Sequence, residues 1–151
     1  VSKDPMLREM VNYGGEEAFG FGSWVGRELA SVCWYWAGDR YRKRNFWPLE
    51  EKEAKLVQIA TSVHYQGMGL ASKLIAYSTR EMGQLGFRRL YARIWHSNRL
   101  SIRAFEKAGW RYIAFVAEVY PFNGKRSFRW VRRMDGRGGK FNLSYHSGCR
   151  G

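Results

Sequence analysis

Two glycines stand one residue apart in the stretch "VHYQGMGLASKLI", residues 63–75, where a polar, β-branched run changes to a helical pattern. A turn of this kind exposes the first backbone N–H groups of a helix, which lack partners inside the helix and attract phosphate together with the helix dipole. Gly67 and Gly69 would let a diphosphate approach the backbone closely, and Lys73 could add a cation one turn later. The alternative is a tight turn that binds no ligand. A hydrolysed nucleotide is not expected, because the stretch lacks the endings of a P-loop and of a dinucleotide fold.

A second polar segment, "SNRLSIRAFEKAGW", occupies residues 97–110. Ser97 or Asn98 can cap a helix at this point, and Gly109 is placed to end it. Capping alone would explain Asn98 and Ser101, although capping and contact with a ligand are compatible. The segment therefore predicts a helix that begins at polar side chains.

Hydrophobic periodicity predicts the elements that position these two segments. We expect a short helix around residues 7–11, a hairpin over 19–36 that turns at Gly26, a loop over 37–54, a strand over 55–63, a helix over 67–85 that Gly86 ends, a strand over 87–95, a helix over 98–108 and a closing hairpin over 110–134. This order predicts an α/β domain with a mixed sheet. We expect one domain over residues 1–134 and a flexible, Gly-rich, basic tail over 135–151.

Residues 59–71, "IATSVHYQGMGLA", resemble motif A of the GNAT superfamily of N-acetyltransferases, whose signature Q/R-x-x-G-x-G/A is met by Gln66, Gly69 and Ala71. Residues 97–110 resemble its motif B, in which an Asn precedes a helix that ends in Lys-x-Gly-aromatic. The resemblance implies an α/β (α+β) fold with a mixed, mostly antiparallel sheet flanked by helices, in which the strands around 57–62 and 89–95 splay apart. The family's first strand and helices should precede residue 19, so this part is abbreviated or the natural chain continues upstream.

The resemblance also implies that acetyl coenzyme A lies between the splayed strands and that no metal takes part. Its diphosphate would accept hydrogen bonds from the backbone of residues 67–71, and its pantetheine arm would pair with the backbone of residues 59–61 and with Asn98. The cofactor-binding residues expected on this ground are Ile59, Ala60, Thr61, Gln66, Gly67, Met68, Gly69, Leu70, Ala71, Asn98 and Ser101.

The family reaction is attack of an amine on the thioester carbonyl, which needs a neutral amine, a polarised carbonyl and a protonated leaving thiolate. Backbone N–H groups near Thr61 could polarise the carbonyl. The family often protonates the thiolate with a Tyr of the motif B helix, but Phe105 stands at that position, and we expect Phe105→Tyr to be tolerated. Where relatives carry a Glu base, this chain has Lys55 or Arg93.

We favour Glu53 and His96 as catalytic residues, with a solvated carboxylate and a locally hydrogen-bonding imidazole as their respective alternatives. Further candidates are His64, Tyr91 and Tyr112. Proton transfer through water is also open, because a thiol with a pKa of about 8.5 leaves without a dedicated acid.

Aromatic side chains are frequent in the segment that forms the acceptor side in relatives: Trp24, Trp34, Tyr35, Trp36, Phe46 and Trp47. A core role is one interpretation. Trp34 and Trp36 share one strand face, with Tyr35 on the other. An aromatic wall beside Glu50, Glu51 and Glu53 would suit a cationic amine.

The net charge of +13, from 26 Lys and Arg against 13 Asp and Glu, favours an anionic partner such as a phosphorylated cofactor or nucleic acid. The sequence therefore predicts an acetyl-CoA-dependent N-acetyltransferase that acts on a small amine, an amino sugar or a protein amino group. The alternative is a non-catalytic acyl-CoA-binding or nucleic-acid-binding module, which the basic residues Arg126, Arg129, Arg132 and Arg133 would serve. Nucleic acid is the less favoured partner, and a homodimer is open.

The two cysteines, Cys33 and Cys149, lie far apart and show neither a disulfide framework nor metal-ligand spacing. We expect Cys33 to be a buried apolar residue. No apolar run approaches the roughly 20 residues of a membrane span, and a cytoplasmic location is expected.

Overall fold

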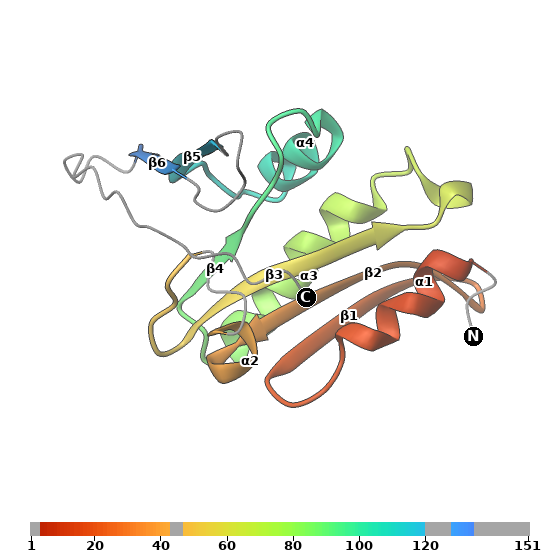
Figure 1. Cartoon of the computed structure of the whole chain (residues 1–151). Helices are drawn as coiled ribbons and strands as arrows, with labels where there is room; N and C mark the ends of the chain where they lie inside the picture. Colours follow the sequence, from red (N-terminus) through yellow and green to blue (C-terminus); the bar gives the residue numbers. More distant parts are fainter. Residues whose placement is uncertain (1–3, 43–46, 120–127, 135–151) are drawn as a thin grey trace. The chain divides into compact units, whose positions relative to one another are not determined.

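The computed structural model describes residues 4–42, 47–119 and 128–134. The chain divides into two compact units, Val1–Trp110 and Arg111–Gly151, and each is considered by itself. The first unit contains a four-stranded sheet whose strand order is β1-β2-β3-β4 (Figure 1). The strands are β1 (Ala18–Val25), β2 (Glu28–Ala37), β3 (Glu53–Thr61) and β4 (Arg89–Ala92). β1, β2 and β3 pair in antiparallel fashion, and β4 is parallel to β3, which confirms the predicted mixed, mostly antiparallel sheet.

The helix α3 (Leu70–Gln84) covers one face of the sheet, and α4 (Arg99–Lys107) packs beside it. The predicted boundaries of α3 are close to those observed, because glycines in the left-handed region stand at both ends. Gly69 is the N-cap with a φ of 73°, and Gly86 follows the last turn with a φ of 96°. The core on this face consists of Cys33, Tyr35, Ala37, Ala54, Leu56, Leu74, Ile75, Met82 and Phe105.

The opposite face of the sheet is covered by α1 (Pro5–Glu9) and the 3-10 helix η1 (Met10–Tyr13). Asp4 caps α1 by accepting a hydrogen bond from the backbone N–H of Met6 at 3.0 Å. Leu7 and Met10 then pack against Val32 of β2 and Ala60 of β3. Because β2 and β3 are covered on both faces, most of their side chains are buried.

The segment 37–54, predicted to be a loop, contains the short helix α2 (Gly38–Arg42), so the prediction is wrong there. Tyr41 is 1% exposed and anchors α2 on the sheet. Asp39 and Arg42 form an exposed ion pair at 3.0 Å. A five-residue helix held by one buried ring leaves no periodic signal in the sequence.

Cys33 is a free, buried cysteine, as predicted. Desolvation raises the pKa of its thiol to about 12, so the thiol stays neutral at physiological pH. Within the described part of the chain, no helix combines the length and apolar character needed to cross a membrane. No group of three or more His, Cys, Asp or Glu residues in the same described ranges is placed to hold a metal ion.

The second unit contains the antiparallel pair β5 (Ala114–Val119) and β6 (Phe128–Arg133), as predicted for the closing hairpin. Phe115 and Trp130 meet edge to face, with ring centroids 6.2 Å apart. The predicted Asn-Gly turn within 121–127 and the predicted tail over 135–151 lie outside the described residues, as does Arg126.

Gly20 of β1 lies under the indole ring of Trp34, and a Cβ built there would stand 2.6 Å from ring atoms. We expect Gly20→Ala to lower the free energy of unfolding by about 1–2 kcal/mol, because the rigid ring must shift. Gly83 in α3 is the matched control, since a Cβ there meets nothing within 4 Å. Gly83→Ala should raise stability by about 0.5–1 kcal/mol. Urea unfolding measures both, and an equal sign for the two changes would contradict the packing described.

Candidate active site

β3 and β4 diverge after a short paired stretch (Figure 1). Their parallel register runs from Glu53 opposite Arg89 to Leu56 opposite Ala92 and stops there. β3 continues to Thr61 and remains paired with β2 along this second half. The edge of β3 over residues 57–61 therefore faces no strand among the described residues. It can pair with an extended ligand as a further strand would.

A β-bulge at Val57 marks the point of divergence. Gln58 is opposite Trp34 and Leu56 is opposite Tyr35, so Val57 is the extra residue of β3. Bulges bend a strand and re-aim its backbone groups. Val57 is a candidate site residue that the sequence does not indicate, because a bulge depends on the pairing of two strands and not on one residue type. It lies four residues, or roughly 13 Å, before Thr61, where we expected the carbonyl-polarising donors.

The turn after β3 has the geometry expected of an anion-binding helix start. It consists of the 3-10 helix η2 (Val63–Tyr65), Gln66 in an extended conformation, and two glycines in the left-handed region. The φ angles of these glycines are 78° for Gly67 and 73° for Gly69. The N–H groups of Gly69, Leu70 and Ala71 have no hydrogen-bond acceptor within the described chain. A Cβ built at Gly67 would meet nothing within 4 Å, and one built at Gly69 would meet only the Ser72 hydroxyl, at 3.9 Å. These N–H groups are therefore accessible to an anion. Lys73 is exposed on the next turn.

The predicted strand residues have mixed environments. Ile59 packs against the α3-side core, and Ala60 belongs to the core under α1. The hydroxyls of Thr61 and Ser31 lie 2.9 Å apart, and the Thr61 carbonyl accepts a hydrogen bond from Gln66 Nε2 at 3.3 Å. Gln66 therefore ties the turn back to β3. Met68 is exposed and its side chain packs little.

Asn98 is the N-cap of α4, as its sequence context predicted. Its Oδ1 accepts a hydrogen bond from the backbone N–H of Ser101 at 3.1 Å, and its carbonyl accepts from Ile102. The capping bond uses the oxygen of the carboxamide. The amide nitrogen of Asn98 hydrogen-bonds to none of the described residues and remains a donor for a ligand.

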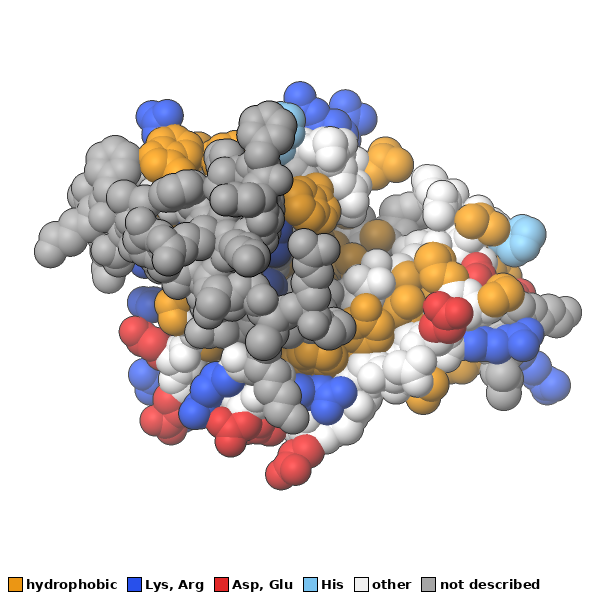
Figure 2. Space-filling view, viewed as in Figure 1, with side chains coloured by type: hydrophobic (Ala, Val, Ile, Leu, Met, Phe, Trp, Pro, Cys, Tyr) orange, Lys and Arg blue, Asp and Glu red, His pale blue; other side chains and the backbone are white. Residues whose placement is uncertain are grey.

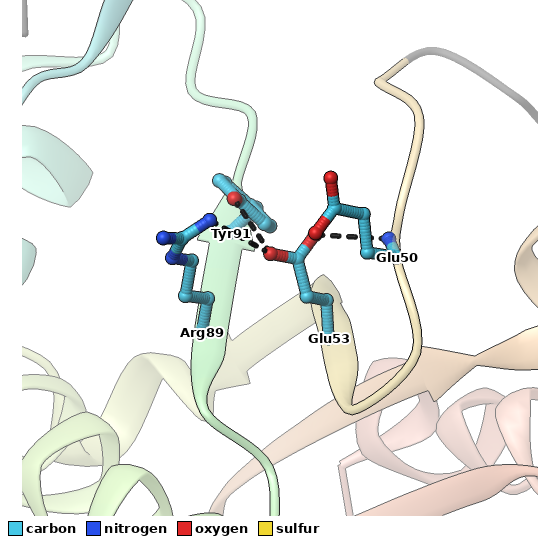
Figure 3. Close-up of polar contacts among 4 residues, drawn as sticks. All are labelled: Glu50, Glu53, Arg89 and Tyr91. Carbon is cyan, nitrogen blue, oxygen red and sulfur yellow. Dashed lines mark hydrogen bonds and ion pairs between the residues drawn. The ribbon is translucent and has the colours of Figure 1, made fainter.

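Glu53 is 6% exposed at the start of β3 and is held by several donors (Figure 3). Its Oε2 accepts from the Glu50 backbone N–H at 3.0 Å, and its Oε1 lies 3.4 Å from Arg89 Nη1 and 3.2 Å from the Tyr91 hydroxyl. Burial, and then the Glu53 charge, raise the pKa of Tyr91, so its hydroxyl is kept protonated and donates. These contacts favour a structural role for Glu53 at the paired end of β3 and β4, away from the bulge.

The other titratable candidates lie in different environments. His96 is exposed in the segment between β4 and Asn98, and His64 is exposed in η2. Lys55 is buried, with its Nζ 5.2 Å from the centroid of the Tyr41 ring. Tyr112 lies in the second unit, whose placement relative to the first is not described.

The aromatic side chains do not form one wall. Tyr35 lies in the core below α3, where its hydroxyl is 2.9 Å from that of Ser78, whereas the Trp36 ring contacts that of Tyr13 in a tilted arrangement, with centroids 5.7 Å apart. Trp24 is largely exposed. Trp47 alone among the predicted set reaches the Glu53 cluster, 6.1 Å from the Tyr91 ring, and Phe46 lies outside the described residues. The faces of Trp34, Tyr35 and Trp36 alternate as predicted.

Charges are unevenly spread over the molecule. Figure 2 shows several acidic side chains, with Lys and Arg side chains among them, over the region where α2 and the start of β3 lie in Figure 1, while Lys and Arg side chains gather over α4. The acidic side chains can attract a cationic group, and the basic side chains over α4 can attract an anion.

Phe105 is 5% exposed and contacts Trp110 edge to face, with centroids 5.0 Å apart. We expect Phe105→Tyr to fold but to lose about 1 kcal/mol of stability, because the added hydroxyl enters a packed apolar cluster. Phe87→Tyr is the control, because Phe87 is only partly buried and a hydroxyl added there is expected to cost less stability. Urea unfolding compares the two. Full stability of Phe105→Tyr together with a higher kcat would show instead that the hydroxyl reaches the leaving thiol.

The Acetyltransferase (GNAT) family model matches residues 6–110 of the chain. Among curated proteins, no sequence matches significantly.

Solved structures share the fold. The ribosomal-protein-S18-alanine N-acetyltransferase from Escherichia coli is 20% identical, with a TM-score of 0.58, over 89% of this chain and 81% of that chain. An acetyltransferase of Bacillus subtilis in complex with CoA is 18% identical, with a TM-score of 0.58, over 77% and 68%. An aminoglycoside acetyltransferase from an uncultured soil metagenomic sample is 14% identical, with a TM-score of 0.57, over 80% and 74%.

Proposed function

We propose that this chain, which belongs to the GNAT acetyltransferase family, transfers the acetyl group of acetyl-CoA to a primary amine. The observation that carries the proposal is the turn after β3. Its left-handed glycines fit a diphosphate, as do the N–H groups of Gly69, Leu70 and Ala71, which have no acceptor among the described residues. The adjoining edge of β3, which pairs with no described strand over residues 57–61, can pair with a pantetheine arm.

The cofactor would supply the activated acetyl group, and the chain would bind and orient it. The N–H groups of residues 67–71 and the dipole of α3 hold the diphosphate. The edge of β3 and the Asn98 amide nitrogen orient the arm. We propose that backbone donors at the Val57 bulge, rather than those near Thr61, polarise the carbonyl, because β3 and β4 part at that point.

For the proton of the attacking amine we propose His96 as acceptor. It is exposed and stands two residues before Asn98, whereas the Glu53 carboxylate is already engaged by three donors. If His96 is the base, His96→Gln lowers kcat while the Kd of CoA is unchanged. An unchanged kcat in this variant favours release of the proton directly to water.

The acceptor class is a cationic amine: a small amine, an amino sugar or a protein amino group. The acidic side chains around the start of β3, together with Trp47 and Tyr91, support it. Two of the structural neighbours are named for an aminoglycoside and for a ribosomal-protein alanine as acceptors. We also propose the cytoplasm as the compartment, on the ground of the free Cys33 thiol.

The test is release of coenzyme A thiol from acetyl-CoA in the presence of an amine panel that includes polyamines, aminoglycosides and peptides with free N-termini. We expect thiol release that depends on both the amine and the protein. A protein that binds CoA tightly but acetylates nothing would support the alternative, a non-catalytic acyl-CoA module, which Phe105 in place of Tyr favours. Sedimentation in the same buffer tests whether the chain forms a homodimer, and binding of an oligonucleotide tests the less favoured nucleic-acid partner.

A further inference from the structure

The turn between β3 and α3 has little packing of its own. Val63 is 65% exposed and Met68 is 56% exposed, and His64 and Gln66 also face solvent. Within residues 63–69, Tyr65 is the one side chain that is partly buried. A glycine-rich turn with so few contacts samples many conformations unless something holds it.

Tyr65 connects this turn to a distant part of the chain. Its hydroxyl donates a hydrogen bond to Glu28 Oε2 at 3.0 Å, across 37 positions of sequence. Glu28 is the first residue of β2 and follows the turn at Gly26, whose φ is 61°. Other hydrogen bonds lie nearby: the Ser62 N–H donates to the Ala30 carbonyl and the Tyr65 N–H to the Ser62 carbonyl, both at 2.9 Å, and Gln66 Nε2 donates to the Thr61 carbonyl at 3.3 Å. Among the side chains of residues 63–69, Tyr65 makes the bond that reaches β2. The Glu28 carboxylate raises the pKa of Tyr65, so the phenol stays a donor at physiological pH.

We propose that the Tyr65–Glu28 hydrogen bond holds the turn in the conformation that receives the diphosphate of acetyl-CoA, which makes both residues positioning residues for cofactor binding. The inference rests on the proposed function. Its physical basis is preorganisation: a turn that is already ordered loses less conformational entropy when the ligand binds. Without the bond, part of the binding free energy is used to order residues 63–69.

The proposal predicts changes in the Kd of coenzyme A that loss of an unrelated surface contact would not produce. Tyr65→Phe and Glu28→Ala should each raise the Kd of coenzyme A by about three- to tenfold, because each removes one hydrogen bond to a charged acceptor. The double variant should be no weaker than either single variant, since the two side chains act through one bond. Glu28→Gln keeps an acceptor oxygen and removes a negative charge from the vicinity of an anion site, so its Kd should match that of the parent or be lower.

The experiment is calorimetric titration of coenzyme A into the full chain and the four variants. Tyr77→Phe is the matched control, because it removes the hydroxyl of an exposed tyrosine farther along α3. In steady-state assays, the KM for acetyl-CoA should rise with kcat unchanged at saturating cofactor. Hydrogen exchange of the free protein should be faster at residues 63–69 in Tyr65→Phe than in Tyr77→Phe.

Three results would overturn the inference: a Kd for Tyr65→Phe equal to that of Tyr77→Phe, additive effects in the double variant, or Glu28→Gln as weak as Glu28→Ala. A parent protein that does not bind coenzyme A would instead reject the proposed function. If the parent binds and the variants bind equally well, only the positioning role fails.

Discussion

Replacing Gly69 by valine should abolish the thermal stabilisation that acetyl-CoA gives the unchanged protein. At a cofactor concentration of about 100 times Kd, mass action adds about 2.7 kcal/mol, which corresponds to a rise of roughly 5–10 °C in the midpoint for a chain of this size. Gly69 has a φ of 73° at the N-cap of α3, a conformation that a β-branched residue rarely adopts. The backbone must shift, and the added side chain occupies the space that the diphosphate needs.

Gly86→Val is the control for backbone strain. Gly86 ends the same helix with a φ of 96°, and a Cβ there meets nothing within 4 Å, whereas a Cβ at Gly69 meets only the Ser72 hydroxyl at 3.9 Å. Both variants should be destabilised without ligand by a similar amount, roughly 1–3 kcal/mol. Differential scanning fluorimetry with and without acetyl-CoA separates the two effects. If Gly69→Val retained the full ligand-induced rise, the turn would not be the diphosphate site.

Removing the Glu53 carboxylate should cost more stability than removing any other single carboxylate near the start of β3. We expect Glu53→Ala to lower the free energy of unfolding by about 2–3 kcal/mol, because it leaves the Glu50 N–H and the Tyr91 hydroxyl without their acceptor and opens a small cavity. Arg89 is largely exposed, so its charge is solvated when its partner is lost. Urea unfolding measures the change.

Glu51→Ala is the control for Glu53, because Glu51 is exposed in the same turn. Surface substitutions of this kind usually stay within about 0.5 kcal/mol. The kinetic comparison uses Glu53→Gln, which keeps the shape and an acceptor oxygen. A structural Glu53 leaves kcat and its pH profile nearly unchanged in Glu53→Gln, whereas a loss of kcat by orders of magnitude in a folded variant would make Glu53 the general base that the sequence suggested.

The parts of the fold that the sequence predicted well are those set by local chemistry. Gly69 and Gly86 delimit α3 because their conformations are available mainly to glycine, and Asn98 caps α4 because its carboxamide can reach a backbone N–H three residues on. The apolar spacing of α3 likewise places Leu74 and Met82 on one buried face.

Other features depend on partners far along the chain and left no local signal. β4 is shorter than predicted, since its pairing with β3 stops at Ala92. The buried state of Glu53 depends on Arg89 and Tyr91, 36 and 38 positions away. The separation of Tyr35 from its neighbours Trp34 and Trp36 follows from strand alternation, but which face α3 covers is decided by packing.

The sequence by itself determined the family, the left-handed glycine turn at residues 67–69 and the limits of the two helices that follow, because glycine dihedrals, capping side chains and motif spacing act over a few residues. The tertiary structure decided where β3 and β4 part, that Val57 forms the bulge at that point, and that Tyr65 reaches Glu28. These depend on strand register and on contacts between distant segments, whose free energy exists only once the sheet has formed.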